Sequence, residues 1–287
     1  MEAYIPTTGR AIQGATSHCL GQNFGKMFKI EYEDNQGKKA IPWQNSWGLT
    51  TRTIGVMVMV HGDDKGLVLP PRVAPIQAVI VPIVMGKKSA GVQLQERAHD
   101  VAAFLREAGI RVHVDDRENY NPGWKYNHWE QKGVPLRLEL GPRDLAQEQV
   151  RVVRRDTGEK EDVSFAVLRE RVKLQLAQMQ HEMLARATAE RDSRLITCTD
   201  RKDFVPNLLK GNMLLTPWCN EEDQEDVVKD WSKEEALKGE QEDERTATSA
   251  AAKTLCIPFE QPDLPEGTKC FFTGKPAVNW TLWGRSY

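Results

Sequence analysis

Residues 76–114 contain a strand, a helix and a second strand in succession, and this unit constrains the fold more than any other part of the sequence. The run 76–84 (IQAVIVPIV) is almost wholly apolar, the stretch from about Val92 to Ala108 has helical periodicity and ends at Gly109, and 110–114 reads as a strand. Two strands joined through a helix usually lie parallel in one sheet. We therefore expect an α/β domain with helices on the faces of its sheet.

The alternation of elements continues to about residue 182 and predicts a mixed sheet. It includes a helix at about 124–131 and strands at 134–140 and 149–155, the second ending at the turn Asp156-Thr157-Gly158. A helical pattern at 165–190 then leads into a small α+β region. The elements expected there are a helix at 201–210, a strand at 213–218, an acidic helix at 221–238, and strands at 254–259 and 278–283.

The first 75 residues are rich in strand signals. We expect strands at 28–32 and 67–69, and a hairpin turn at Asn35-Gln36-Gly37. The segment 47–61 has two interpretations, a continuous β-branched strand or a short strand followed by a buried helix from about Thr51. Periodicity alone does not separate them.

Composition and cysteine usage limit the class of protein. The chain has 287 residues, of which 40% are hydrophobic and 28% charged, as in folded globular proteins of about two domains. Its apolar runs are far shorter than the ~20 residues that span a bilayer, and no membrane partner is expected. The five cysteines include no CxxC pair, which indicates free thiols and a cytoplasmic location.

The charge is unevenly distributed along the chain. The formal net charge is −2, yet residues 219–245 alone carry −8, so the remainder carries +6 and a partner with phosphates remains open. The segment 239–252 has low hydrophobicity and is predicted to be a mobile loop.

The segment 9–24 (GRAIQGATSHCLGQNF) is the first candidate site. Gln13, Thr16 and His18 lie within six positions among small residues, so a ligand can approach closely and meet neutral donors and acceptors. On these residues alone, a polar turn with a satisfied core histidine is the simpler interpretation.

A collinear set of further segments points to one known family. The segments include 44–52 (QNSWGLTTR), 66–75 (GLVLPPRVAP), 121–130 (NPGWKYNHWE), 154–160 (RRDTGEK) and 284–287 (GRSY). Together with 9–24 they resemble the C-terminal portion of prolyl-tRNA synthetase of the eukaryotic and archaeal type. The resemblance implies the end of a class II catalytic domain with its antiparallel sheet at 1–75, an α/β anticodon-binding domain at 76–182 and a C-terminal domain at 183–287.

The resemblance also implies roles for individual residues. Gln13, Thr16, Thr50 and Arg52 match the family's ATP contacts, and His18 matches a proline-pocket residue. Arginine is always charged and offers a planar fork of donors, so Arg52 suits a triphosphate or an adenine face.

The reaction implied is the ATP-dependent activation of L-proline, normally with Mg²⁺, followed by transfer to tRNA(Pro). No side-chain nucleophile is required. The family's earlier class II motifs do not occur in this sequence, so we expect this chain alone not to activate proline, and the resemblance implies a homodimer for the full-length form. The alternative is an inactive tRNA-binding or accessory protein that keeps an anticodon-binding domain.

Two further expectations concern metal and tRNA. The family commonly holds zinc with four cysteines, but Cys219 is followed five positions later by Gln224, and Cys270 two later by Phe272. We therefore predict no zinc, with the aromatic side chains of Trp218, Phe271, Phe272, Trp280 and Trp283 packing instead. For tRNA, the candidates at strand ends and helix starts are Arg117, Lys125, Arg137 and Arg143. Trp124 and Trp129 are expected in the core rather than stacked on a base.

Overall fold

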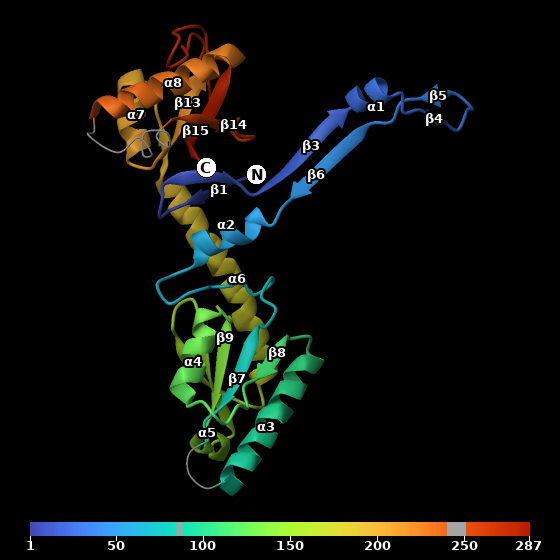
Figure 1. The fold of residues 1–287 in the computed structure, drawn as a ribbon, viewed down its shortest axis with the longest axis vertical. Helices are drawn as coiled ribbons and strands as arrows, with labels where there is room; N and C mark the ends of the chain where they lie inside the picture. Colours follow the sequence, from blue (N-terminus) through green and yellow to red (C-terminus); the bar gives the residue numbers. More distant parts are fainter. Residues whose placement is uncertain (85–87, 240–250) are drawn as a thin grey trace. The chain divides into compact units, whose positions relative to one another are not determined.

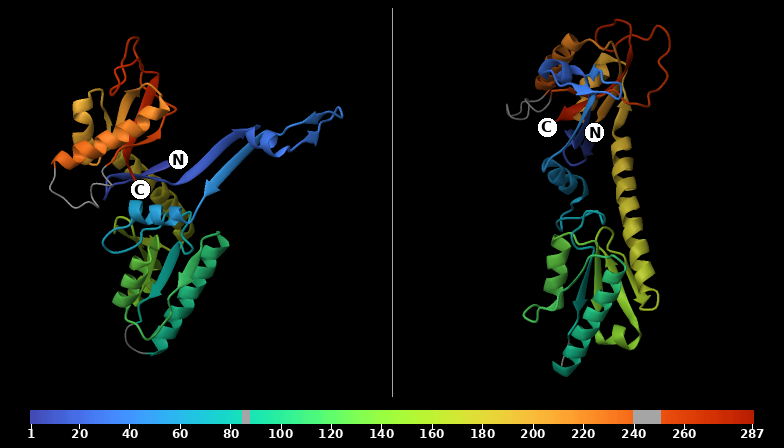
Figure 2. Two further views of the ribbon diagram at one scale, coloured as in Figure 1. Left: turned by 45° about the horizontal axis from the view of Figure 1, so that its top comes forward. Right: turned by 90° about the vertical axis from the view of Figure 1, so that its right-hand side faces the viewer.

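The chain forms two compact units, described here from a computed structural model that covers residues 1–84, 88–239 and 251–287. Unit 1 combines Met1–Val56 with Glu190–Tyr287, and unit 2 is Met57–Ala189 (Figures 1 and 2). Unit 1 is thus built from segments that lie far apart in the sequence.

Unit 2 contains a mixed five-stranded sheet. Its order is β11-β10-β9-β7-β8, in which β7 pairs in parallel with β8 and β9 while β9, β10 and β11 run antiparallel. The strands are β7 (Ala78–Pro82), β8 (Val112–Val114), β9 (Leu136–Leu140), β10 (Gln149–Arg154) and β11 (Lys160–Ser164). The predicted α/β class with a mixed sheet is confirmed.

Both faces of β7 are buried, which explains why its sequence is apolar throughout. Ala78 and Ile80 belong to the larger core, which also contains Leu94 and Val172, whereas Val79 and Val81 pack with Trp129 on the other face. Successive side chains of a strand point to opposite faces, so a strand covered on both sides needs apolar residues at every position. The helices of this unit are α3 (Lys88–Glu107), α4 (Pro122–Gln131), α5 (Pro142–Ala146) and α6 (Leu168–Ser193).

Local signals fix the ends of these helices. Gly109, with φ of +79°, follows α3 in the left-handed region that favours glycine. The Asn121 side chain accepts a hydrogen bond from the backbone N–H of Trp124 at 2.9 Å, and Pro122 begins α4 without needing a donor of its own. The start of α4 is therefore set by its sequence.

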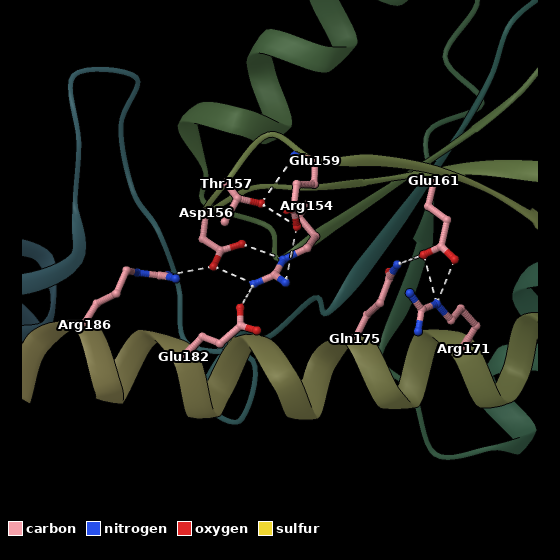
Figure 3. A network of polar contacts seen from close by, with 9 residues as sticks. All are labelled: Arg154, Asp156, Thr157, Glu159, Glu161, Arg171, Gln175, Glu182 and Arg186. Atoms are coloured by element: carbon pink, nitrogen blue, oxygen red, sulfur yellow. Dashed lines mark hydrogen bonds and ion pairs between the residues drawn. The ribbon is translucent and has the colours of Figure 1, made fainter.

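A polar network attaches α6 to the end of β10 (Figure 3). Arg154 donates to the carboxylates of Asp156, at 3.0 and 2.9 Å, and of Glu182, at 2.6 Å, and Arg186 donates to Asp156 at 2.7 Å. The Asp156 side chain is only 1% exposed. Burial alone would raise the pKa of Asp156, but the two guanidinium groups outweigh it and lower that pKa. The carboxylate is therefore held charged between two cations.

Unit 1 contains a sheet of the order β1-β2-β15-β13-β12, with β14 also paired to β15. The strands are β1 (Glu2–Ile5), β2 (Arg10–Gln13), β12 (Leu195–Thr197), β13 (Met213–Trp218), β14 (Lys253–Cys256) and β15 (Asn279–Ser286). Arg285 and Ser286 of β15 pair in parallel with Arg10 and Ala11 of β2. One sheet thereby joins the first residues of the chain to the last ones.

The core of unit 1 beside this sheet is rich in aromatic side chains. Trp218 and Trp283 are at most 1% exposed, and Phe204 from α7 (Arg201–Leu209) packs with both Phe271 and Trp283. Helix α8 (Glu222–Gly239) adds Trp231. The predicted packing of Trp218, Phe271, Phe272 and Trp283 in this region is confirmed, and Trp280 is also buried.

A two-stranded ribbon extends from the β1–β2 hairpin. Strands β3 (Ala15–Gly21) and β6 (Gln44–Leu49) pair antiparallel, and helix α2 (Arg52–His61) follows β6. Between the two strands lie α1 (Asn23–Phe28), β4 (Tyr32–Glu33) and β5 (Lys39–Ala40). The predicted turn at 35–37 joins β4 to β5 and is confirmed.

Several expectations for this region were wrong. Of the strand predicted at 28–32, only Tyr32 lies in a strand, β4, because α1 extends to Phe28 and Lys29 ends it with φ of 55°. Residues 67–69 form no strand, since Leu67 and Leu69 donate to the carbonyls of Gln131 and Gly133 in a loop. The segment 47–61 adopts the strand-then-helix alternative, but the helix is not buried, for Val56 is its one buried residue.

Strands β1, β2, β3, β11 and β12 and helices α1 and α5 were not predicted, and all except β3, which has seven residues, have six residues or fewer. The two units do not test the predicted domain limits at 75 and 182, which remain a prediction. The predicted loop at 239–252 lies mostly, over 240–250, outside the described residues.

Candidate functional site

A cleft of about 410 Å³ in unit 1 brings together residues from both ends of the chain. Its lining consists of Glu2, Ile12, Gln13, Arg52, Thr254, Leu255, Ser286 and Tyr287. Gln13 ends β2, Arg52 begins α2, and Ser286 and Tyr287 lie at the end of β15. Two of the five residues predicted for the ATP and proline sites, Gln13 and Arg52, therefore line one cleft.

Thr16 is connected to this cleft through Gln13. The Gln13 side-chain amide donates to the hydroxyl of Thr16 at 2.8 Å. The Thr53 hydroxyl donates to the carbonyl of Gly14 at 2.8 Å and thereby ties the first turn of α2 to the chain between β2 and β3. Since Arg52 precedes Thr53, this bond also fixes the backbone position from which the Arg52 side chain extends.

The other two predicted residues lie nearby but do not line the cleft. His18 is exposed on β3 opposite Ser46, two positions after Thr16 and so on the same face of the strand. Thr50 is an exposed residue between β6 and α2.

Sequence reasoning missed the contribution of the C-terminal residues to the cleft. The backbone N–H of Tyr287 donates to the carbonyl of Ala11 at 3.3 Å, and Arg10 lies 5.2 Å from the Tyr287 ring centroid. In the sequence, the segment GRSY (284–287) stood out only through its family resemblance, because its residue types alone indicate no particular chemistry.

A second pocket, of about 530 Å³, lies in unit 2 where β7 and β8 end. Among its lining residues are Pro82, at the end of β7, and Arg117, Tyr120 and Lys125. Ligand sites in open α/β sheets are commonly found outside the carboxyl ends of parallel strands. Arg117 and Lys125, both predicted from the sequence to meet tRNA, are thus brought together here.

The buried carboxylate of Asp115 organises this pocket. It accepts two hydrogen bonds from Arg117, at 2.8 and 2.7 Å, and one from the indole N–H of Trp129 at 2.7 Å. Burial alone would raise the pKa of Asp115, but these hydrogen bonds and the charge of Lys125 outweigh it and lower the pKa to about 2. Lys125 is itself buried, which lowers its pKa, and its ammonium group donates to the Asp115 carbonyl at 2.9 Å.

Aromatic rings form a stack beside Arg117. The rings of Tyr120 and Trp124 are 3.8 Å apart and nearly parallel, and His128 stacks on Trp124 at 4.9 Å. The Arg117 guanidinium lies 5.0 Å from the Tyr120 ring and 5.1 Å from the Trp124 ring. Trp124 is 40% exposed. The prediction that both tryptophans belong to the core is therefore right for Trp129 and wrong for Trp124.

The other two basic candidates lie apart from this pocket. Arg137 pairs with Glu139 at 3.0 Å, lies 4.3 Å from the Tyr126 ring and lines a separate pocket of about 200 Å³ with Arg154, Arg155 and Lys160. Arg143 is exposed near the start of α5.

The two cysteines predicted as remnants of a zinc site lie in contact. Cys219 and Cys270 are buried in the same hydrophobic cluster, and burial raises the pKa of Cys219. No group of three or more His, Cys, Asp or Glu residues gathers to hold a metal within residues 1–84, 88–239 and 251–287. A closed zinc site needs four N or S ligands, so the donors present do not fit zinc.

The described part of the chain also contains no helix long and apolar enough to cross a membrane.

Comparison with known proteins identifies two domains. Residues 77–175 match the family model of the anticodon binding domain. Residues 201–287 match the family model of the prolyl-tRNA synthetase C-terminal domain. The first match contains the pocket of Arg117, and the second contains the aromatic core of unit 1.

Three relatives match the whole of this chain. The chain is 51% identical over 288 residues to "Proline--tRNA ligase, cytoplasmic" of Arabidopsis thaliana, covering 52% of that protein. It is 46% identical to a putative proline--tRNA ligase of Saccharomyces cerevisiae, covering 42%, and 48% identical to the bifunctional glutamate/proline--tRNA ligase of Drosophila melanogaster, covering 17%. The chain thus spans about half the length of the first of these relatives.

Proposed function

This chain belongs to the prolyl-tRNA synthetase family, and we propose that it acts in the ATP-dependent attachment of L-proline to tRNA(Pro). Its membership rests on its anticodon-binding domain, its C-terminal domain and its identity to proline--tRNA ligases along its whole length. In this reaction the proline carboxylate attacks the α-phosphate of ATP and pyrophosphate leaves. A terminal hydroxyl of the tRNA then attacks the prolyl-adenylate and releases AMP.

The cleft of Gln13 and Arg52 supports a role in the first step. Positioning and charge stabilisation suffice for this chemistry, because both nucleophiles belong to substrates. Arg52 stabilises the charge that gathers on the departing pyrophosphate, and the bonded side chains of Gln13 and Thr16 offer neutral donors and acceptors to the nucleotide. His18 and Thr50 are assigned to proline and ATP by family resemblance.

Mg²⁺ is proposed as the companion of ATP. Glu2 is the carboxylate that lines the cleft, so it is the residue of this chain that would meet such an ion. The ion, when bound to the phosphates, neutralises part of their charge.

The observation that carries the tRNA part of the proposal is the exposed aromatic stack beside Arg117, within the region that matches the anticodon binding domain. RNA is read mostly through unstacked bases that lie on aromatic rings or guanidinium planes. Trp124 is the exposed middle ring of this stack, because Tyr120 and His128 both stack on it, and Arg117 places a positive charge 5.1 Å from its centroid. An RNA base would therefore extend the stack at its end rather than lie on Trp124 itself. Lys125 acts as a positioning residue, since its ammonium group is buried on Asp115.

Binding of tRNA(Pro) to this chain tests the proposal. Trp124→Ala should weaken binding about 5- to 150-fold, because it removes the middle ring of the stack and stacking of one base contributes about 1–3 kcal/mol. Trp124→Phe should retain most of the affinity, and Phe259→Ala, which removes a fully exposed ring elsewhere, should have no effect. Unchanged binding by Trp124→Ala would exclude the stack from the interface.

The ligase and the accessory-protein alternatives differ in nucleotide binding. A protein that only binds tRNA has no need of Gln13 and Arg52 in one cleft, which favours the ligase. ATP binding by the chain, lost in Arg52→Ala, would support the ligase, whereas tRNA binding without any ATP binding would support the alternative.

The remaining parts of the proposal come from the sequence and from family resemblance. They are the domain limits at 75 and 182, tRNA contacts by Arg137 and Arg143, a homodimeric full-length form and the absence of zinc. The Arabidopsis relative is named as a cytoplasmic protein, and together with the five free thiols of this chain this supports a cytoplasmic location.

A further inference from the structure

The turns that carry Cys219 and Cys270 meet in unit 1, at a position where the donors do not complete a metal site. Gln224 and Phe272 stand where, by the family resemblance, two further cysteines are expected. Without a metal, some other interaction must hold these turns against the helices, since structural zinc contributes directly to folding where it is bound.

Arg201 lies over two neighbouring aromatic rings at this position. Its guanidinium is 4.4 Å from the centroid of the Trp231 ring and 4.2 Å from that of Phe272. The three residues come from three elements, because Arg201 begins α7, Trp231 lies within α8, and Phe272 belongs to the turn after Cys270. One cation that contacts two adjacent rings therefore connects both helices to the turn.

The aromatic contacts continue from this arginine into the core. The ring centroid of Phe272 lies 5.2 Å from that of Trp231 and 6.0 Å from that of Phe271. Phe271 in turn stacks on Phe204, with 4.7 Å between the ring centroids. Such ring pairs add stability beyond the area that they bury. The arginine is thus the outer end of a continuous aromatic cluster.

Backbone and ionic contacts join the two cysteine turns directly. The N–H of Phe271 donates to the carbonyl of Pro217 at 3.1 Å, and the N–H of Val278 donates to that of Trp218 at 2.8 Å. Lys275 pairs with Glu221 at 2.7 Å. The turns are therefore fixed to each other by contacts of the polypeptide itself.

The polar groups at this position do not form a set of metal ligands. Arg201 lies against Phe272, and Lys275 pairs with Glu221. Within the described residues no group of three or more His, Cys, Asp or Glu gathers here, so the two thiols do not complete a zinc site.

We propose that the aromatic clasp formed by Arg201, Trp231 and Phe272 takes the structural place of zinc in this chain, so that its C-terminal domain folds without metal. We expect that cysteine at positions 224 and 272 would allow zinc to bind, whereas Gln224 and Phe272 leave the clasp in its place. The inference rests on the family assignment of the domain and not on any activity, so its tests need no aminoacylation.

Thermal unfolding of unit 1, followed by tryptophan fluorescence in the full chain, tests the clasp. Arg201→Gln should lower the melting temperature by about 2–6 °C, the shift expected when a cation–π contact is lost from a unit of this size. Arg201→Lys keeps the charge, so its melting temperature should fall between those of the wild type and Arg201→Gln. Lys202→Gln, which removes the neighbouring exposed charge, is the matched control and should leave the melting temperature unchanged.

Metal analysis tests the exchange of clasp for metal. The chelator-washed wild-type chain, after incubation with zinc and desalting, should hold none, while Gln224→Cys combined with Phe272→Cys should hold about one zinc per chain and lose stability on chelation. One zinc in the wild type, an unchanged melting temperature in Arg201→Gln, or no zinc in the double variant would each overturn the proposal.

Discussion

The guanidinium of Arg117 makes two parallel hydrogen bonds to the buried carboxylate of Asp115 while its other side faces the ring of Trp124, 5.1 Å away. Two parallel N–H···O bonds fix both the position and the plane of the arginine. The exposed ring next to it is therefore presented beside an oriented positive charge rather than a mobile one. This pairing decides what the pocket can bind.

Two replacements of Arg117 should separate the effect of its fixed orientation on tRNA binding from the effect of its positive charge. Arg117→Lys keeps the charge but loses the bidentate contact, so we expect tRNA binding to weaken about 5- to 20-fold with little loss of stability. Arg117→Ala leaves Asp115 without its main partner and should cost about 1–3 kcal/mol of unfolding free energy as well. Equilibrium binding and urea unfolding measure the two effects, and equal binding by both variants and the wild type would contradict the role given to the arginine.

The lowered pKa of Asp115 predicts a specific acid sensitivity. Its folded-state pKa of about 2 lies below the ordinary value of 3.8, so the charged carboxylate stabilises the fold above pH 4, and this contribution disappears as the pH falls from about 4 to 2. The contribution is on the order of 2 kcal/mol. Other carboxylates in the chain titrate in the same range, so the comparison is with Asp115→Asn. Its stability deficit relative to wild type should be full at pH 6 and shrink towards pH 3, and a deficit independent of pH would contradict the assignment.

Arg52→Ala should lower the rate of ATP–pyrophosphate exchange by about 10²–10³-fold in a form of the protein that activates proline, as loss of one charge-stabilising donor does elsewhere. Arg191→Ala is a matched control, because Arg191 pairs with its exposed neighbour Asp192 and lies outside the cleft. Equal rates for Arg52→Ala and Arg191→Ala would remove Arg52 from the site.

Asp156→Asn should weaken the attachment of α6. The buried carboxylate is shared by Arg154 and Arg186, and an amide would both lose its charge and turn a donor towards two cations (Figure 3). We expect a loss of about 2–4 kcal/mol in the unfolding free energy of unit 2. Asp162→Asn, which removes the carboxylate of an exposed arginine pair, should cost less than about 1 kcal/mol. Hydrogen exchange along α6 would locate the change, and similar costs for both variants would argue against the network.

The regular elements could be predicted where a strong period or a chemical end signal was present. The apolar run of β7 and the Asn121-Pro122 start of α4 are examples, and the strand 213–218 was predicted at its observed bounds. The strands β1 and β2 have four residues each, too few for a period to emerge. Their partners also lie elsewhere, since β2 pairs with β15, and no local pattern reports such a pairing.

The sites could be predicted residue by residue only in part. Family resemblance named Gln13 and Arg52, but Glu2 and Tyr287 reach the same cleft by tertiary pairing. Trp124 was assigned to the core because large aromatic residues are usually buried, yet its helix turns Trp129 inwards and leaves Trp124 exposed. Five positions on a helix amount to about 500° of rotation, so the two rings point in different directions.

The parallel pairing of β15 with β2 has a consequence for biosynthesis. Residues 10–13 are synthesised long before residues 285–287 and wait for them before their sheet is closed, so the cleft of Gln13 and Tyr287 forms only after residues 285–287 have been made. A transcript with a premature stop codon, even one just before Gly284, would therefore yield a chain with an open sheet edge and no finished nucleotide cleft. An affinity tag fused directly to Tyr287 would begin inside that cleft, and purification handles for this protein are better placed elsewhere.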